Sequence, residues 1–224
     1  MPKGNRWAAD GGFVDLTRPV TEDMATYPGE PPVMLRRLYN GPFVSFEISL
    51  SSHAGTSLDT PLHVQPDGGK SLGAYEVSRF ILAATVAHLD LGMDEVIDKA
   101  AISGALMGGA GAGSRPGRCL LIDTGWARHW GSPRYWRHPF LGQDAAMAIA
   151  ESDISLVGID TPNVDSTMQN KSVVHRVLLG ADVLVVENLC NLDLLDGSGR
   201  SWTLACLPLS VPSADGSPVR AVAW

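Results

Sequence analysis

Short runs of apolar and β-branched residues recur along this chain, and segments with helical spacing lie between them. Each run has the length of a β-strand, and several carry apolar residues at consecutive positions, as strands buried on both faces do. The runs cover residues 84–91, 118–126, 155–162, 182–189 and 202–209. Helical patterns cover residues 94–107, 142–152 and, more weakly, 173–180. Strands interleaved with helices predict an α/β domain with mixed sheets.

The length of the chain fits one compact enzyme. With 224 residues, 45% of them hydrophobic, the chain can bury one sizeable core and needs no second domain. It contains no internal repeat and no linker segment. We therefore expect a single domain spanning residues 1–224.

Charge and hydropathy exclude several classes of partner. The chain has 17 basic and 24 acidic residues, a net charge of −7, and offers no basic stripe for a nucleic-acid backbone. No apolar run approaches the roughly 18 residues that span a bilayer, and the N-terminus lacks the apolar stretch of a signal peptide. We expect a soluble cytoplasmic protein with a small-molecule substrate and no nucleic-acid or membrane partner.

A further strand is predicted at residues 43–50, FVSFEISL, because apolar and polar side chains alternate there. Val44, Phe46, Ile48 and Leu50 fall on one face of such a strand, and the residues between them fall on the other. This strand leads directly into the part of the chain richest in chemically active side chains.

Residues 52–63 read SHAGTSLDTPLH and contain His53, Asp59 and His63. Imidazole nitrogens and carboxylates are ligands that Zn²⁺ and Mn²⁺ accept, so this spacing can supply several metal contacts from one segment. A glycine permits a sharp turn and a proline stiffens the backbone before the last histidine. Two histidines ten residues apart are, taken alone, more often ordinary loop residues, but the surrounding residues favour an active site.

The segment HAGTSLDTPLH resembles the signature His-x-Gly-Thr-His-x-Asp-x-Pro-x-His of the cyclase family of metal-dependent hydrolases, which includes bacterial kynurenine formamidases and isatin hydrolases. Ten of the eleven positions agree when the free positions are counted, and Ser57 stands where the family has a metal-binding histidine. The resemblance extends over about nine-tenths of the chain, through the segments at 15–32, 158–162, 173–179, 185–188 and 217–222. It implies an α/β fold of the swivelling β/β/α kind.

The resemblance also implies roles for individual residues. It implies that His53, Asp59, His175 and Glu187 bind metal, that both carboxylates can bridge two ions, and that His63 is the general acid/base. Glu187 is unusual even without the resemblance, because four apolar residues directly precede this charged residue. A carboxylate in so apolar a run is costly to bury unless it is paired with a cation or binds metal.

The implied reaction is hydrolysis of an amide or lactam-like bond by water that the metal activates, with His63 moving the proton. An unperturbed imidazole titrates near pH 6.5, so it can both accept and donate a proton. Tyr27 falls where formamidases place an aromatic residue against the substrate, which suits a planar aryl group. An exposed ring in a Tyr-Pro-Gly turn is the alternative for Tyr27. N-formylkynurenine is the best single candidate substrate.

Ser57 limits the number of metal ions that we expect. A neutral hydroxyl is a poor ligand beside imidazole, so we expect one Zn²⁺ or Mn²⁺ ion, with any second ion bound weakly. Ser57 is then a weak ligand or a substrate contact. A serine nucleophile activated by His63 is disfavoured, because the sequence identifies no partner carboxylate and no oxyanion hole for it.

Two other functions stay open at this point. The first is a metal-dependent cyclase, dehydratase or lyase of secondary metabolism, in which the metal stabilises an enolate and His63 moves a proton. The second is a non-catalytic descendant that has lost its metal. The presence of His63, Asp59 and Glu187 argues against the second.

The segment at 126–140 holds three of the six tryptophans, together with His129 and His138, neither of which has ligand spacing. An active-site rim or subunit contact and a plain packed loop are equally good interpretations of this segment. The family resemblance implies a homodimer or homotetramer, and this segment would suit such a contact.

Three smaller features complete the analysis. The glycine-rich segment at 108–117 lacks the Gly-Lys-Ser/Thr ending of a phosphate loop and predicts a flexible surface loop. His88 is flanked by apolar residues, and we expect a structural, hydrogen-bonded side chain there. The three cysteines, at positions 119, 190 and 206, lie in or beside apolar runs, which predicts reduced, buried thiols.

Overall fold

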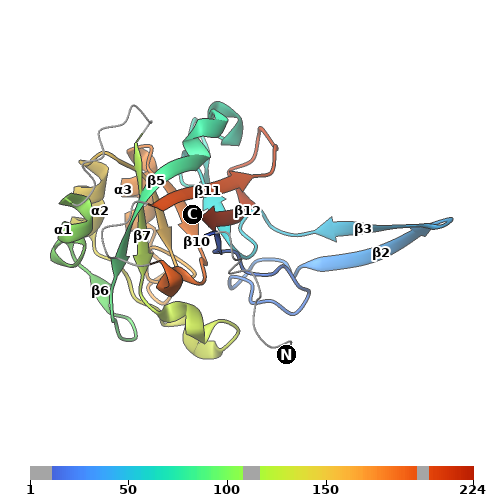
Figure 1. Ribbon diagram of the computed structural model, residues 1–224, viewed down its shortest axis with the longest axis horizontal. Helices are drawn as coiled ribbons and strands as arrows, with labels where there is room; N and C mark the ends of the chain where they lie inside the picture. The colour runs from blue at the N-terminus through green and yellow to red at the C-terminus, as the bar shows by residue number, and fades with distance from the viewer. Residues whose placement is uncertain (1–11, 108–116, 196–201) are drawn as a thin grey trace.

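The computed structural model describes residues 12–107, 117–195 and 202–224. The loop predicted at 108–117 lies, apart from Gly117, outside the described residues. The predicted α/β organisation is confirmed: a closed sheet forms the centre, and helices pack on its outer surface (Figure 1).

Seven strands close into a barrel in the order β12, β11, β5, β7, β9, β10 and β4, and β4 pairs back with β12. Their bounds are β4 Ser57–Asp59, β5 Ile81–His88, β7 Arg118–Asp123, β9 Ile154–Ile159, β10 Leu184–Glu187, β11 Trp202–Pro208 and β12 Gly216–Ala223. The two-residue strand β1, Val14–Asp15, extends the sheet beside β12. Strands β5, β7, β9 and β10 are parallel neighbours, and β4, β11 and β12 run antiparallel to theirs. These parallel strands and β11 match the five apolar runs of the sequence.

Within the described ranges, three helices cover the outside of the barrel: α1 (Lys99–Met107), α2 (Gln143–Ala150) and α3 (Val173–Gly180). Helix α1 begins later than its pattern predicted. Val96–Ile97 forms instead a short strand, β6, which pairs with β8 (Phe140–Leu141). The Asp98 carboxylate accepts the amide of Ala101 at 2.9 Å, which starts the helix after the strand.

Short 3₁₀ turns connect these elements. Their bounds are η1 Pro61–His63, η2 Leu72–Ala74, η3 Val77–Phe80, η4 Trp126–His129, η5 Pro133–Trp136 and η6 Leu192–Leu194.

The barrel strands separate two apolar cores, because successive side chains of a strand point to opposite faces. Leu58, Leu121 and Val186 belong to the cluster that fills the barrel. Ile122 and Val185 belong to the cluster between the barrel and the helices. The neighbours of Leu58 in β4, at positions 57 and 59, therefore face outward, toward the helix side.

One element lies outside the barrel and the helices that cover it. Strands β2 (Met34–Asn40) and β3 (Phe43–Ser49) form an antiparallel hairpin that projects far from the barrel, on the side away from α1 and α2 (Figure 1). The alternating segment at 43–50 is thus a strand, as predicted, and it leads into the segment that carries the two histidines.

Several smaller predictions are confirmed. The cysteines are free and buried. His88 Nε2 donates to the carbonyl of Leu195 at 2.7 Å, and its Nδ1 lies 2.8 Å from Asp123 Oδ2 at the end of β7, so both ring nitrogens are hydrogen-bonded, as predicted. Among the described residues, none of the helices has the length and apolarity needed to cross a bilayer.

Candidate metal centre

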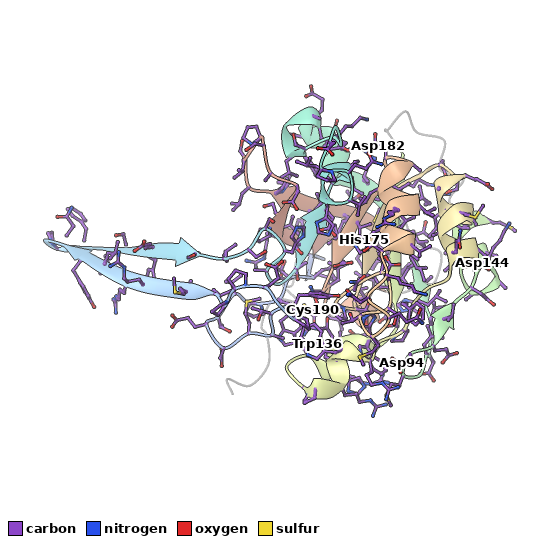
Figure 2. All side chains as sticks on the ribbon, turned by 180° about the vertical axis from the view of Figure 1, so that it is seen from behind. Asp94, Trp136, Asp144, His175, Asp182 and Cys190 are labelled. Carbon is purple, nitrogen blue, oxygen red and sulfur yellow. The ribbon has the colours of Figure 1, made fainter. Side chains whose placement is uncertain are left out.

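The five side chains that the sequence singled out as ligands and acid/base meet around one cavity of about 230 Å³. His53 comes from the segment between β3 and β4, Asp59 ends β4, and His63 ends η1. His175 lies on α3 and Glu187 ends β10. Figure 2 labels His175 near the centre of the molecule, on the helix that lies against the barrel strands. The fold therefore brings together residues more than a hundred positions apart.

The strand register aims Asp59 and Glu187 at the same side of the barrel. Strand β4 pairs with β10 so that Glu187 lies opposite Ser57, and Val185 lies opposite Asp59. Paired residues share a face, and Val185 faces the helices. Both carboxylates consequently point out of the barrel, toward α3.

Asp165 holds His175 in a fixed orientation. Its Oδ2 accepts the backbone amide of His175 at 2.9 Å and lies 2.8 Å from the ring Nδ1, while Oδ1 accepts the amide of Val174 at 2.8 Å. With Nδ1 engaged in this way, Nε2 is the nitrogen that faces Asp59 and Glu187.

The Nε2 atom of His175 is buried and has no hydrogen-bond partner among the described residues. It lies 3.4 Å from Asp59 Oδ2 and 3.3 Å from Glu187 Oε1 without making a hydrogen bond to either. A buried polar atom left in this way is rare in native proteins. One imidazole nitrogen between two carboxylates is a donor set that fits a divalent cation such as Zn²⁺ or Mn²⁺.

The electrostatics of these groups agree with a cation site. Burial raises the pKa of Glu187, and the nearby Asp59 carboxylate adds to that effect. Burial opposes the charged form of His175, but the hydrogen bond to Asp165 and the close carboxylates of Asp59 and Glu187 outweigh it, so the pKa of His175 lies well above 6.5. Carboxylates crowded in a buried space require a positive charge, which a proton on His175 or a metal ion can supply.

A second cluster joins His53 to His63 through Asp215, a residue that the sequence analysis did not single out. Asp215 Oδ2 lies 2.9 Å from His53 Nε2 and 3.2 Å from His63 Nδ1. The other ring nitrogen of His53 lies 2.8 Å from Asp59 Oδ1. Burial opposes the charged form of His53, but the two carboxylates raise its pKa to about 11.

Two glycines permit this arrangement. Gly55 has a φ of +67°, a backbone conformation that side chains disfavour, and it turns the chain between His53 and β4. A Cβ at Gly216 would lie 2.7 Å from the carbonyl oxygen of Leu58 and 2.8 Å from His53 Cε1. The imidazole of His53 thus packs directly on the backbone of β12.

Ser57 is buried, with 1% of its surface exposed, and lies beside Glu187 in the β4–β10 ladder. It is not among the residues that line the cavity. The predicted weak ligand or substrate contact at Ser57 stays a prediction, whereas the other predicted ligands all line the cavity.

Aromatic side chains form part of the cavity wall. Tyr27, Trp130 and Trp136 line it, and the rings of Tyr27 and Trp136 meet edge to face at 5.9 Å between centroids. Tyr27 Oη also accepts a hydrogen bond from Asn163 Nδ2 at 3.3 Å. The tryptophan-rich segment therefore contributes to the rim of the site, although its first tryptophan, Trp126, is fully buried.

Comparisons with known proteins agree with this geometry. A family model described as putative cyclase matches residues 14–166. The kynurenine formamidase of Bacillus mycoides (strain KBAB4) is 29% identical over 214 residues, which cover 94% of this chain and 96% of the relative. The kynurenine formamidase of Geobacillus thermodenitrificans (strain NG80-2) is 27% identical over 220 residues, covering 93% and 95% of the two chains.

The fold is also similar to that of a solved isatin hydrolase bound to the product analogue thioisatinate. The TM-score is 0.81, with 22% sequence identity, and the match covers 94% of this chain and 91% of the other. This likeness confirms the fold that the resemblance implied.

Proposed function

Because this chain belongs to the putative cyclase family, whose model matches residues 14–166, we propose that it is a metal-dependent hydrolase of a small aryl formamide, lactam or related cyclic amide. The observation that carries the proposal is the buried Nε2 of His175, which lies between Asp59 and Glu187 and has no hydrogen-bond partner in the described part of the chain. The names of the relatives, kynurenine formamidase and isatin hydrolase, support hydrolysis as the reaction.

His53, Asp59, His175 and Glu187 would hold the metal, Zn²⁺ or Mn²⁺. A divalent cation at this place supplies Lewis-acid polarisation of a carbonyl group and lowers the pKa of a water molecule. The two histidines are not equivalent, because both ring nitrogens of His53 are hydrogen-bonded to carboxylates, whereas Nε2 of His175 makes no hydrogen bond to a described residue. We expect one ion, next to His175.

His63 is the residue that moves the proton. One of its ring nitrogens lies within 4.8 Å of ligand atoms of both Asp59 and His175, so it can reach a water molecule held beside them. Its Nδ1 faces Asp215, and when Nδ1 donates to this carboxylate, Nε2 is left to accept a proton. The same nitrogen can then deliver the proton to the leaving amine.

Asp215 positions this base. It touches both His53 and His63, and Ser52 Oγ donates to its other oxygen at 3.0 Å, so the carboxylate is fixed from two sides. The hydrogen bond from His53 lowers the pKa of Asp215, which keeps it ionised. An ionised carboxylate beside Nδ1 selects the imidazole tautomer that leaves Nε2 unprotonated.

The cavity wall supports an aryl substrate. Tyr27, Trp130 and Trp136 offer aromatic surface for a planar ring, and Asn163 and Asn188 offer polar groups for its substituents. N-formylkynurenine combines an aryl ring with a formamide, and it is our first candidate.

The test is an assay of the metal-loaded protein with N-formylkynurenine, together with a panel of aryl formamides and lactams. Formation of kynurenine, or of the hydrolysed amine from another member of the panel, supports the proposal. Protein treated with a chelator should lose this activity and regain it with zinc or manganese. No turnover of any aryl amide by protein that binds metal would contradict hydrolysis and favour a cyclase or lyase reaction.

A further inference from the structure

The cavity wall carries a carboxylate that the proposed reaction does not use, that of Glu30. This residue is partly buried and lines the cavity together with Tyr27. Among the described residues, the Glu30 carboxylate has no hydrogen-bond donor and no basic partner. A carboxylate that lines a substrate cavity in this way is available to a group of the substrate.

A β-turn places Glu30 next to Tyr27. The four residues of the turn read Tyr-Pro-Gly-Glu, the amide of Glu30 donates to the carbonyl of Tyr27 at 3.0 Å, and Gly29 has a φ of +97°. Proline followed by a glycine of positive φ is the pattern of a type II turn, whose first and last Cα atoms lie within about 7 Å of each other. Tyr27 is itself held by the ring of Trp136 and by the hydrogen bond from Asn163. The carboxylate and the aromatic ring therefore occupy neighbouring, fixed places on the wall.

The fixed charge around this cavity is negative. The described residues that line it include three carboxylates, those of Glu30, Asp59 and Glu187, and neither a lysine nor an arginine. Asp59 and Glu187 lie next to His175 and face the place where the divalent cation is expected. Glu30 forms no ion pair with a histidine of the described cavity wall. Its charge is the one that the candidate metal centre does not balance.

Two basic residues come near the wall without lining the cavity. The guanidinium of Arg18 lies over the ring of Trp130, 4.8 Å from its centroid, and donates to a backbone carbonyl at 2.8 Å. Lys171 stands between Asn170 and Ser172, which line the cavity, but is not itself a lining residue. A carboxylate on a substrate therefore meets no basic side chain of the described wall, whereas an ammonium group meets Glu30.

We propose that Glu30 and Tyr27 form a subsite for an ammonium group, and that the substrate is an aryl formamide which carries a protonated alkyl amine. This inference rests on the proposed hydrolase function and names its substrate class. The amine donates to the Glu30 carboxylate and lies against the Tyr27 ring, and both contacts favour a cation. A substrate without an amine covers the carboxylate and leaves it without a partner, which costs binding free energy. N-formylkynurenine meets the requirement through its α-ammonium group, whereas a simple lactam does not.

The first experiment compares N-formylkynurenamine, which carries the ammonium group, with 2-formamidobutyrophenone, in which a methyl group replaces it. For the metal-loaded wild type, kcat/KM should be about tenfold higher for the amine, the usual effect of a hydrogen bond to a charged group. This ratio should fall toward one in Glu30→Gln. The control Glu151→Gln removes the same charge from an exposed position after α2 and should keep the wild-type ratio. A wild-type ratio near one, or equal ratios in the two variants, would overturn the proposal.

The second experiment measures binding without turnover, so that a failure of the subsite can be distinguished from a failure of the proposed reaction. Calorimetry gives the dissociation constants of the two deformylated compounds, kynurenamine and 2-aminobutyrophenone. The wild type should bind kynurenamine about tenfold more tightly, and Glu30→Gln should abolish the difference. This binding pattern without hydrolysis of any formamide would support the subsite and contradict the reaction. Hydrolysis of both formamides with equal kcat/KM would support the reaction and overturn the subsite.

Kynurenine tests whether a carboxylate is recognised instead. It carries the ammonium group of kynurenamine and a carboxylate in addition, and it should bind no more tightly, because the described wall has no basic side chain for the carboxylate. Equal or weaker binding of kynurenine supports the proposal. Tighter binding that Glu30→Gln leaves intact and Lys171→Gln removes would make the carboxylate the recognised group and overturn it.

Discussion

Asp165 engages His175 twice, since the same carboxylate oxygen lies 2.9 Å from the backbone amide and 2.8 Å from the ring Nδ1. The start of α3 and the direction of the imidazole are thereby fixed by one side chain. A ligand oriented in this way loses little freedom when it binds a cation, so the affinity of the site depends on a residue that does not itself touch the metal.

The variant Asp165→Asn tests this dependence. The amide oxygen of asparagine can still accept one of the two helix amides, so we expect the fold to persist, while the affinity for zinc falls by about 10–100-fold because the imidazole is less well oriented. Competition with a chromophoric chelator measures the affinity. Asp153→Asn is the matched control, since Asp153 pairs with Arg118 at the surface, away from the cavity. Equal zinc affinities in the two variants would contradict a role of Asp165 in orienting His175 for metal binding.

Asp215→Asn should separate proton transfer from substrate binding. We expect kcat to fall by roughly 10–100-fold, part of the usual contribution of a general acid/base, because His63 loses the carboxylate that selects its tautomer. The KM should change little, because Asp215 does not line the cavity. Asp182→Asn is the control, because Asp182 pairs with Lys70 and Tyr75 in a separate cluster. A variant that alters KM and kcat equally would indicate a general loss of the site's structure instead.

The sequence predicted the metal ligands and the acid/base of this site, but not the two carboxylates that orient its histidines. The motif around His53 and the buried position of Glu187 were visible because residue type and apolar context are local properties. Asp215 gave no comparable signal, since it lies in a Ser-Ala-Asp-Gly stretch that has the composition of an ordinary turn. Only the pairing of β12 with β4 brings it to His53. Asp165 lies in the connection before α3 and likewise gave no local signal in the sequence.

The hairpin of β2 and β3 shows a related limit of sequence patterns. The alternation at 43–50 correctly predicted a strand, because side-chain direction follows from the period of the backbone. The pattern cannot predict that the apolar side chains of this strand are exposed in the structure, because that depends on where the rest of the fold lies. The apolar runs also could not predict that β4 closes the barrel, because this strand has only three residues.

Ser57→His should raise the number of bound metal ions from near one to near two per chain. The substitution adds an imidazole next to Glu187 and so supplies the donor that the family signature has at this position. Metal analysis by mass spectrometry of protein purified without chelator measures the ratio. The control is Ser103→His on α1, away from the cavity. If the wild type already holds two ions, Ser57 does not limit the site and the one-ion expectation is wrong.

His138 should make the protein less stable in acid for a reason independent of metal. Burial lowers the pKa of His138 to about 4, while its Nδ1 donates to the carbonyl of Pro139 and its Nε2 accepts from Thr167 Oγ1 at 2.8 Å. In the unfolded chain a histidine titrates near pH 6.5, so below that pH the unfolded state binds the proton and the native state does not. The neutral form is favoured by folding, and its contribution is complete above pH 6.5 and is lost as the pH falls toward 4.

His138→Gln keeps a donor and an acceptor but does not titrate. Between pH 6.5 and 4 the wild type should lose up to about 3 kcal/mol of unfolding free energy that the variant does not lose, at about 1.4 kcal/mol per pKa unit. Urea unfolding at a series of pH values gives both curves. Every other titrating group is common to the two proteins, so their difference isolates His138, and above pH 7 this difference must be constant. Parallel curves down to pH 4 would show that His138 is protonated in the folded protein, and that its buried hydrogen bonds are not those of a neutral imidazole.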